Sequence, residues 1–253
     1  MITSKKLLKQ KRISHGFFNM DGGKSIGIYK SLNCGTGSMD KNYKVKQNLN
    51  IVKKRIGKKT KDIFLVRQNH TSKYIFINKN FKFYKKKIEA DAIITNQKNL
   101  PIGILTADCV PLLLYDKKKN FIAIVHAGWK GAFKGIVKKV ISFMFKKGCS
   151  GKTITAVIGP CIAQKSYEVK KDFFKKFTKN DKKNKLFFQI QNGMFFFNLS
   201  KFIESQIKNY KITNIDRIKI DTFDKKNNFF SARRSSKLKH DDYGRNISII
   251  MIN

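Results

Sequence analysis

Two histidines and one cysteine stand at the ends of short apolar runs in the central part of the chain. His70 closes IFLVRQNH, Cys109 follows IGILTAD, and His126 lies near the end of FIAIVHAG. Loops at strand ends are where sheet proteins commonly place ligand sites. The three residues are separated by 39 and 17 positions, which is too far for a local finger motif. They can meet only through the tertiary fold.

This set supplies two imidazoles and one thiolate, which suits Zn²⁺ and leaves a fourth position for water. In such a site the metal lowers the pKa of its water to about 7, so that hydroxide is available at neutral pH. The same residue types also have common structural uses. A buried cysteine usually packs as a small hydrophobic group, and a histidine at a strand end usually forms hydrogen bonds in the core or at its rim. From these residues alone, the structural interpretation is favoured.

Short apolar runs rich in β-branched residues, each closed by turn residues, predict the strands. They cover residues 63–70, 92–95, 102–108, 111–116, 121–128 and 154–160, with later strands at 216–220 and 246–252. Before the strand at 154–160, Ile136, Val140 and neighbouring apolar residues follow the spacing of a helix face, and this helix ends at Gly148. Further helices are expected at 167–178 and 199–210.

Helices and strands alternate in the middle of the chain, but the connection at 116–120 is short enough to be a hairpin, which requires antiparallel pairing. The fold class is therefore α/β or α+β, with layered mixed sheets flanked by helices. No linker rich in Gly, Ser or Pro interrupts the sequence, so residues 1–253 are predicted to form a single domain. The polar, lysine-rich stretches 78–88 and 178–185 are expected to be exposed loops.

The formal net charge is +39, which would normally indicate a polyanionic partner such as nucleic acid. However, Lys, Asn, Ile and Phe, whose codons are rich in A and T, make up 123 of the 253 residues. The lysines are spread along the whole chain, whereas phosphate and base readers favour clustered arginine. The charge therefore indicates codon drift with incidental polyanion binding, and no specific nucleic-acid partner is expected.

The four cysteines stand far apart without a repeated spacing, so they do not form a disulfide framework. The basic start MITSKKLLKQKR lacks an apolar signal region, and no apolar run approaches the length of roughly 18 residues that a membrane span needs. We therefore expect a soluble, cytoplasmic protein that does not bind a membrane. No coiled coil or other assembly pattern is present, so a monomer is expected.

Seven segments, taken in order, carry a resemblance that changes the interpretation of the histidines and cysteine. They are SHGFF…DGGKSIGIYKSLNCGTGSMD (14–40), RQNH (67–70), EADAIIT (89–95), TADCVPLLLYD (106–116), VHAGWKGAFKGIV (125–137), IGPCIAQKSYEV (158–169) and FFSARR…YGR (229–245). Together they resemble the motifs of the YfiH-like family, also called the laccase-domain or peptidoglycan editing factor family. The match covers nearly the whole chain, and its motifs are long and specific.

The resemblance implies that His70, Cys109 and His126 form a zinc site. It also implies purine nucleoside chemistry: phosphorolysis of adenosine, inosine, guanosine and methylthioadenosine, together with deamination of adenosine to inosine. Purine nucleosides and phosphate would then be the partners. The fold implied is a layered α/β architecture around mixed sheets, in agreement with the pattern of elements.

Three positions depart from the family pattern. Met20 stands where members commonly carry arginine, Thr71 where glycine is usual, and Asp221 where a cysteine is common. None of them is a proposed metal ligand. Met20 removes a possible anion contact, so phosphate binding is less firmly implied than metal binding.

Asp108 and Cys109 are the two candidate catalytic residues. If the segment before Cys109 stays extended, alternation places Asp108 on the opposite face from Cys109, so that it does not bind the same metal. Asp108 would then orient a neighbouring histidine or loop amide, or act in proton transfer if the strand breaks before it. A simple turn cap ahead of Pro111 is nearly as well supported.

Four residues are candidates for substrate binding. Trp129, the only tryptophan, could stack on a purine, although packing against the sheet is the usual use of such a residue. Arg233, Arg234 and Arg245 attract attention because arginine is scarce here, and a guanidinium suits bidentate binding of phosphate or a carboxylate. Structural ion pairs are equally consistent with them. Gly128 and the glycine at 131 permit a tight strand-to-helix turn whose free N–H groups could hold an anion.

Four functions compete on this basis. The first is a zinc-dependent purine nucleoside phosphorylase with adenosine deaminase activity, although the usual zinc deaminase signature is absent. The second is a hydrolase with Cys109 as nucleophile, acting on peptidoglycan precursors or amides. The third, a copper phenol oxidase, is disfavoured because a multicopper cluster needs more imidazoles than the four histidines of this chain provide. The fourth is a basic binding protein without catalysis.

Overall fold

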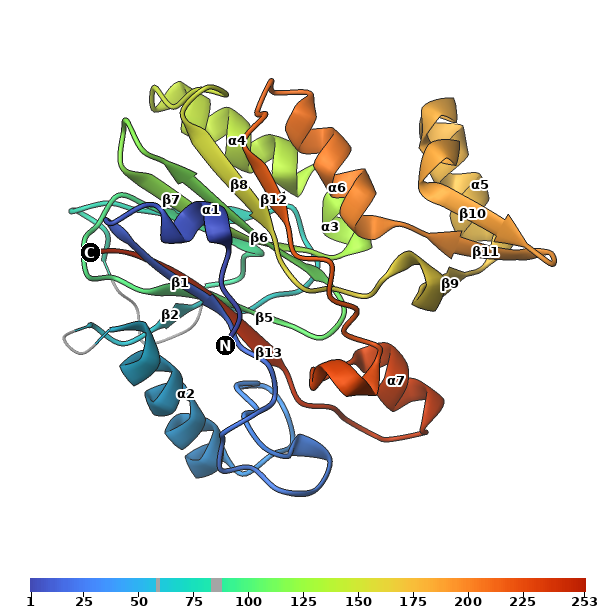
Figure 1. Cartoon of the computed structure of the whole chain (residues 1–253), viewed down its shortest axis with the longest axis horizontal. Coiled ribbons are helices and arrows are strands. Elements are labelled where there is room, and N and C mark those ends of the chain that lie inside the picture. Colours follow the sequence, from blue (N-terminus) through green and yellow to red (C-terminus); the bar gives the residue numbers. More distant parts are fainter. Residues whose placement is uncertain (58–59, 83–87) are drawn as a thin grey trace.

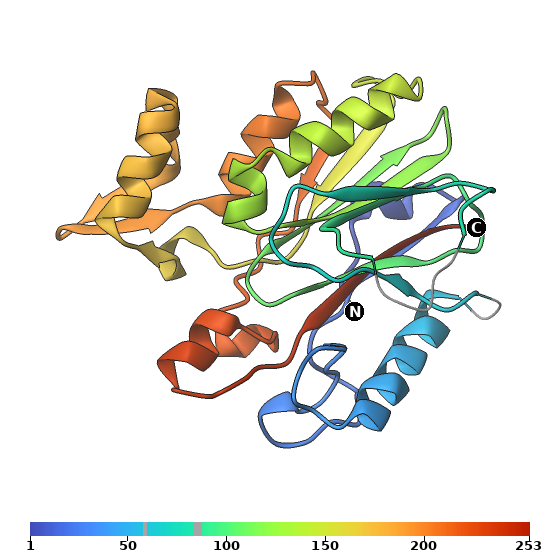
Figure 2. The ribbon, with the colours of Figure 1, turned by 180° about the vertical axis from the view of Figure 1, so that it is seen from behind.

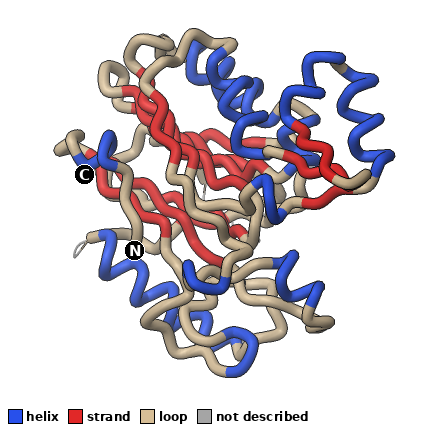
Figure 3. The backbone as a smooth tube through the Cα atoms, turned by 45° about the vertical axis from the view of Figure 1, so that its right-hand side comes forward, coloured by secondary structure: helices blue, strands red, loops and turns tan. Residues whose placement is uncertain are grey.

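The computed structural model describes residues 1–57, 60–82 and 88–253. Its strands form three sheets, with helices on the outside of the two larger ones (Figures 1 and 3). The strand orders are β12-β8-β6-β7-β4-β3, β1-β13-β5-β2 and β10-β11-β9. Parallel and antiparallel neighbours occur within both larger sheets, so the expected mixed α/β class is confirmed.

The six-stranded sheet lies at the centre of the molecule. Its strands are β3 (Tyr74–Ile77), β4 (Ala92–Thr95), β6 (Val110–Asp116), β7 (Phe121–Ala127), β8 (Ile154–Ile158) and β12 (Ile215–Arg217). Every residue of β4, β6, β7 and β8 is buried, as expected for strands covered on both faces. Successive side chains of a strand point to opposite faces. Accordingly, Leu112 and Leu114 pack in one core cluster, and Leu113 and Tyr115 pack in another.

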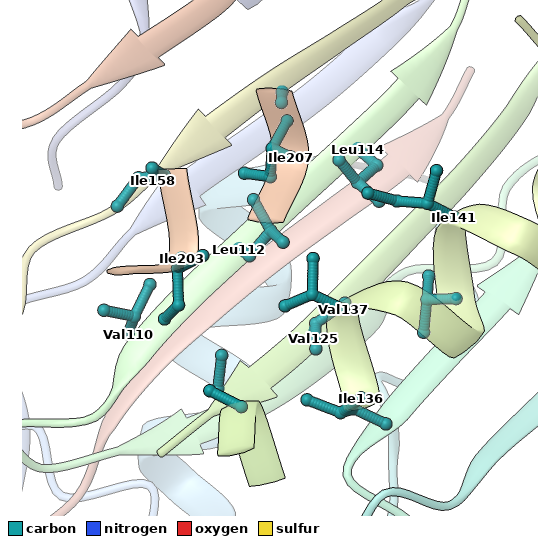
Figure 4. Packing of buried hydrophobic residues seen from close by; sticks show 14 of the residues in the cluster. Val110, Leu112, Leu114, Val125, Ile136, Val137, Ile141, Ile158, Ile203 and Ile207 are labelled. Atoms are coloured by element: carbon teal, nitrogen blue, oxygen red, sulfur yellow. The ribbon is translucent and has the colours of Figure 1, made fainter. Parts of the chain in front are cut away.

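The first of these clusters is covered by helices. They are α3 (Trp129–Phe133), α4 (Ile136–Lys146) and α6 (Leu199–Lys208). The apolar stripe of α4 and the inner face of α6 meet the strands at Val125 and Leu112 (Figure 4). Because α4 follows the β7 strand through α3, this packing fixes the loop that leaves the end of β7.

The four-stranded sheet covers the other face of the central sheet. Its strands are β1 (Ile13–Phe17), β2 (Phe64–Leu65), β5 (Ile102–Thr106) and β13 (Asn246–Ile252). In β13, Ile250 packs toward the central sheet, while Ile247 and Ile249 pack with Val52 of α2 (Asn42–Ile56) on the outer side (Figure 2). The two sheets therefore form adjacent layers, and β5 and β6 bring one chain segment from one layer to the other.

The third sheet and α5 form an extension at one end of the molecule (Figure 1). The elements are β9 (Glu168–Val169), α5 (Lys171–Asn180), β10 (Phe188–Gln191) and β11 (Met194–Phe197). Phenylalanines hold them together, with the rings of Phe173 and Phe177 stacked at 4.6 Å and Phe197 packed against both. The remaining helices are α1 (Lys5–Leu8), α7 (Ala232–Lys237) and 3-10 turns at Gly27–Tyr29, Gln164–Ser166, Lys182–Phe187 and Lys225–Asn227.

Several predicted boundaries are wrong. The strand predicted at 63–70 is limited to Phe64–Leu65, and the strand predicted at 102–108 ends at Thr106, because the chain leaves the sheet there for the loops that carry His70 and Cys109. The helix predicted at 167–178 begins only after β9. The expected loop at 178–185 is the end of α5 followed by a 3-10 helix. Part of the expected loop at 78–88 lies outside the described residues.

Some elements were not predicted at all, among them β1, β3, α2, the β10–β11 hairpin and α7. The single-domain prediction for the whole chain stays a prediction. Across the described ranges, no helix has both the length and the apolar composition needed to cross a bilayer.

Candidate metal centre

His70, Cys109 and His126 lie together where the central sheet meets the four-stranded sheet. Their ligand atoms are all within 4.8 Å of one another, and this is the one group of its kind found among the described residues. Cys109 Sγ is 3.6 Å from Nε2 of His70, and the two histidine rings have centroids 4.8 Å apart. His126 is buried and His70 is exposed. The group is therefore held from the core side and open on the other.

The strand register positions Cys109 and His126. In the antiparallel β6–β7 pair, His126 lies opposite Pro111, and Val110 lies opposite Ala127. Cys109 immediately precedes β6, so it reaches the sheet beside His126. The short β6–β7 hairpin thus brings Cys109 and His126, 17 positions apart in the sequence, into contact.

His70 comes from a loop that is tied to β5 by Gln68. After the short parallel β2–β5 pairing ends at Leu65, the side chain of Gln68 continues the ladder. Its amide nitrogen donates to the carbonyl oxygen of Leu105 (2.7 Å), and its amide oxygen accepts from the N–H of Leu105 (2.8 Å). His70 follows with a φ of 55°, in the left-handed region, so the chain turns sharply and presents its ring to Cys109.

Asp91 connects the two histidines. Its side chain is fully buried, and Oδ1 lies 2.7 Å from Nδ1 of His126 and accepts from the backbone N–H of His70 (3.1 Å). Oδ2 accepts from the backbone N–H and the hydroxyl of Thr71, at 2.6 and 2.7 Å. With Nδ1 engaged, Nε2 of His126 is left facing Cys109. Asp91 therefore fixes both the ring of His126 and the loop that carries His70.

Asp91 was absent from the predicted site, although a signal was present in EADAIIT. An acidic residue directly before an apolar strand of a central sheet is a candidate for burial, and a buried carboxylate needs partners. Thr71, which departs from the family pattern, supplies one of them, because its hydroxyl gives Asp91 a donor that glycine lacks.

Gly128 leaves room for the cluster. A Cβ at this position would lie 2.7 Å from Cδ2 of His70 and 2.8 Å from Sγ of Cys109. Its φ of −70° is ordinary, so close approach rather than backbone conformation requires glycine here. Likewise, a Cβ on Gly131 would lie 2.8 Å from the carbonyl oxygen of Thr71. These glycines let α3 pack against the His70 loop, and the anion site expected at this turn stays a prediction.

Electrostatics favour a thiolate in this group. Burial raises the pKa of Cys109, but the charge and hydrogen bond of His126, together with His70, outweigh it and lower the pKa to about 6. Burial lowers the pKa of His126, but the facing thiolate and the Asp91 carboxylate raise it to about 9. Without a metal, Cys109 and His126 form a thiolate–imidazolium pair at neutral pH. A metal that binds here displaces the proton of His126.

The donor set and its space therefore fit a metal ion. One thiolate and two imidazoles converge from three elements, the acceptor on Nδ1 of His126 is in place, and Gly128 keeps the centre free of side-chain atoms. This arrangement can bind a metal. The identity of the metal belongs to the proposal below.

Two cavities border the cluster. A cleft of about 560 Å³ is lined by residues of the His70 loop, the end of β5 and the C-terminal loop, including Arg67, Leu105 and Arg245. A smaller hollow of about 190 Å³ is lined among others by Tyr167 and Arg233. Both are also lined by His70, Ala107, Cys109 and Tyr243.

Asp108 does not sit in an extended strand. β5 ends at Thr106, and Asp108 has a φ of 84°, so the alternation expected from a continuous strand does not apply. Its buried carboxylate accepts from the hydroxyls of Thr222 (2.7 Å) and Ser231 (2.9 Å) and from the backbone N–H of Arg233 (2.7 Å). Burial raises its pKa, while these hydrogen bonds act in the opposite direction. Asp108 thus accepts hydrogen bonds from the start of α7, and it does not orient a histidine.

The four predicted substrate-binding residues separate into two groups. Arg233 and Arg245 line the hollow and the cleft, respectively. Arg234 donates to the carbonyl oxygens of Thr222, Phe223 and Phe229 and lines neither cavity. Trp129 packs against Phe173 at 4.9 Å and lines neither cavity, in line with its packing alternative, and stacking on a purine stays a prediction.

Comparison with known proteins identifies a family and a closely similar fold. Residues 14–253 match the family described as "Multi-copper polyphenol oxidoreductase laccase". The crystal structure of Bacillus licheniformis hypothetical protein YfiH superposes with a TM-score of 0.86 at 26% identity, covering 95% of this chain and 93% of that one. The resemblance to the YfiH-like family is thereby confirmed.

Several relatives carry enzyme names. A purine nucleoside phosphorylase of Rickettsia conorii is 36% identical over 191 residues, which cover 75% of this chain and 77% of that protein. One of Bacteroides thetaiotaomicron is 31% identical over 245 residues, covering 92% and 91%. An adenosine deaminase from an unknown prokaryotic organism is 32% identical over 131 residues, covering 49% and 50%.

Replacing Asp91 with asparagine should weaken metal binding about 10- to 100-fold, because His126 and the His70 loop lose their common acceptor. Competition of the purified variant with a chromophoric chelator for Zn²⁺ measures this. Glu89→Gln is the matched control, because Glu89 is exposed and forms a surface ion pair with Lys73 at 3.3 Å. Equal zinc affinity in Asp91→Asn and Glu89→Gln would contradict the role given to Asp91.

Gly128→Ala should displace His70 or Cys109 and lower zinc affinity, because the added Cβ overlaps both side chains. Gly37→Ala serves as the control, since a Cβ there meets nothing within 4 Å. The same chelator competition and a thermal melt are measured for both variants. Wild-type zinc affinity in Gly128→Ala would show that the cluster does not depend on this close approach.

Alkylation of metal-free protein should report the lowered thiol pKa. Cys109 is expected to react with iodoacetamide with a midpoint near pH 6, because its thiolate persists above that value. Peptide mass spectrometry across a pH series gives the midpoint for each cysteine. His126→Asn should move the midpoint upward, and Zn²⁺ should protect Cys109. A wild-type midpoint near the ordinary thiol value of 9 would contradict the ion pair.

Proposed function

Because the chain belongs to the family described as "Multi-copper polyphenol oxidoreductase laccase", with relatives named purine nucleoside phosphorylase, we propose that it is a zinc-dependent enzyme of that kind. Its substrates would be adenosine, inosine, guanosine or methylthioadenosine, with phosphate. A second activity, deamination of adenosine, draws support from the relative named adenosine deaminase. The single observation that carries the proposal is the His70–Cys109–His126 group at the junction of the two cavities.

The donor set favours zinc over a multicopper cluster. The chain has four histidines, and the two outside the group are engaged elsewhere: His15 accepts from the N–H of Ser4, and His240 lies 3.2 Å from the Ser235 hydroxyl. A single copper with two histidines and one cysteine would serve electron transfer, a role that needs no substrate cleft at the metal. Here the group borders a cleft of about 560 Å³, which suits a catalytic metal with an open position.

When bound, Zn²⁺ supplies Lewis acidity at the junction of the cavities. The protein holds His126 through Asp91, keeps the thiolate of Cys109 deprotonated and presents His70 from the open side. The cleft would hold a nucleoside against this group, with Arg67 and the Asp242-paired Arg245 in its wall. These residues orient the substrate and lower the cost of negative charge that develops in the reaction.

Phosphorolysis and deamination would share this cleft but break different bonds. In phosphorolysis, an oxygen of hydrogen phosphate bonds to the anomeric carbon as the bond from that carbon to the purine breaks. The proton of the phosphate ends on the purine. In deamination, water adds at C6 and ammonia leaves. The amine of adenosine must then lie near the cluster, whereas phosphorolysis requires the sugar there.

A cysteine hydrolase is the second candidate, and one observation favours it. The thiolate–imidazolium pair of Cys109 and His126 resembles the activated nucleophile of cysteine enzymes, with Asp91 in the place of the orienting third group. Peptidoglycan precursors or amides would be the substrates. In that case zinc would bind the Cys109 thiolate and inhibit the hydrolase.

The cellular setting is part of the proposal. All four cysteines are free, and the candidate site needs a reduced thiol, which suits the cytoplasm. We place the protein there and expect it to act as a monomer.

The test measures bound metal in purified protein and follows adenosine with and without phosphate. Phosphate-dependent release of adenine, or formation of inosine, is expected, and Cys109→Ala should abolish activity together with bound zinc. Cys149→Ala is the control, because Cys149 is a buried thiol in the core away from the site. Full activity in metal-free protein would overturn the zinc proposal. Amide hydrolysis that is inhibited by zinc would favour the second candidate.

A further inference from the structure

The arginines near the cluster are distributed unlike the other cations. The chain contains 48 lysines and seven arginines. Among the described lining residues, neither cavity includes a lysine, yet Arg67 and Arg245 line the cleft and Arg233 lines the hollow. Lysine occupies nearly every other cationic position of the chain, so the arginines at the cavities indicate a need for the planar guanidinium. A guanidinium binds tetrahedral oxyanions through paired hydrogen bonds.

Arg233 is held in place without being neutralised. Its Nη1 donates to the carbonyl oxygen of Glu168 at 2.8 Å, and its guanidinium carbon lies 5.3 Å from the ring centroid of Tyr167. Its backbone N–H donates to Asp108. Within the described ranges, no carboxylate lies at ion-pair distance from this guanidinium, in contrast to Arg245, which pairs with Asp242 at 3.0 Å.

The size of the hollow limits what can enter it. At about 190 Å³ it has roughly one third of the volume of the cleft, and the side chains of Ile162 and Leu199 line part of its wall. A purine nucleoside fits the cleft, whereas a small inorganic anion fits the hollow. Because His70, Ala107 and Cys109 border both cavities, a ligand in either would lie beside the metal centre.

The carboxylate of Asp108 also borders the hollow, and it must not repel an anion there. Both of its oxygens are engaged, with Thr222 on one side and with Ser231 and the N–H of Arg233 on the other. Its hydrogen-bonding capacity is directed at α7 and the Thr222 loop, and these donors offset its charge. The remaining N–H groups of the Arg233 guanidinium are therefore the arginine donors available to a ligand in the hollow.

We infer that the hollow is the subsite for inorganic phosphate and that Arg233, positioned by Tyr167 and Glu168, is its principal donor. This inference rests on the proposed phosphorylase function. Phosphate in the hollow would attack the anomeric carbon beside the cluster while the purine departs into the cleft. The purine nitrogen gains a proton from water, and the proton that hydrogen phosphate loses returns to water. Attack and departure then occur from opposite sides, as a displacement at that carbon requires.

Kinetics of Arg233→Gln, Arg233→Lys and Lys237→Gln test the assignment. Lys237 is an exposed cation on the same helix and serves as the matched control. Arg233→Gln should raise the KM for phosphate about tenfold or more and leave the KM for the nucleoside within about twofold. Arg233→Lys should recover part of the loss, because it keeps the charge but not the planar fork. Lys237→Gln should leave both KM values at their wild-type level.

Direct binding separates this inference from the proposed function. Titration of each protein with inorganic phosphate, followed by ³¹P NMR in about 0.2 M salt to screen the surface lysines, measures occupancy without turnover. Loss of a saturable phosphate signal in Arg233→Gln, with retention in Lys237→Gln, supports the subsite even if no nucleoside is cleaved. Equal phosphate binding and equal phosphate KM in wild type and Arg233→Gln would overturn it, even for an active phosphorylase. A thermal melt equal to wild type shows that the variant is folded.

Discussion

The geometry of the candidate centre depends on one buried carboxylate. Asp91 is removed from water, and a charge in that position is stable only when it is paired and hydrogen-bonded. Its partners are the ring of His126 and donors from His70 and Thr71, so satisfying the carboxylate also closes the His70 loop onto β7. The pairing that lowers the cost of burying Asp91 is thus the same pairing that assembles two of the three ligands. The third ligand, Cys109, then completes the group through its charge interaction with His126.

The layers of the fold provide the rigid frame for this arrangement. Alternate side chains of β6 and β7 pack under the helices on one face and against the four-stranded sheet on the other. Shifting either strand by one residue would exchange the two faces, so the register that places His126 opposite Pro111 is strongly fixed. The loops at the strand ends are free to carry polar residues, because the core does not depend on them. The lysine-rich exterior has little influence on this frame, since exposed charges interact weakly through water and salt.

Sequence reasoning found the elements whose signal is local. The strand at 92–95 has the predicted bounds, and the helix around Val140 and the strand pair on either side of the hairpin follow their apolar patterns. Pieces such as β1, β3 and α2 were not predicted, because β1 contains Ser14, His15 and Gly16, β3 has only four residues, and α2 is a lysine-rich helix with a weak apolar stripe. The strand predicted through Asp108 was too long, since the break there is enforced by hydrogen bonds to Thr222 and Ser231 more than 100 residues away.

The sequence by itself determined the fold class, the family and the three residues of the candidate centre, because long ordered motifs and buried-strand patterns are written in consecutive residues. Only the tertiary structure decided how those residues are held. It placed Asp91 between the histidines and showed that Asp108 binds donors at the start of α7. It also separated Arg233 and Arg245, which border the cavities, from Arg234, whose guanidinium donates to backbone carbonyl oxygens. The physical reason is that hydrogen-bond satisfaction in a buried site depends on distances between distant segments. Residue type and spacing along the chain do not specify those distances.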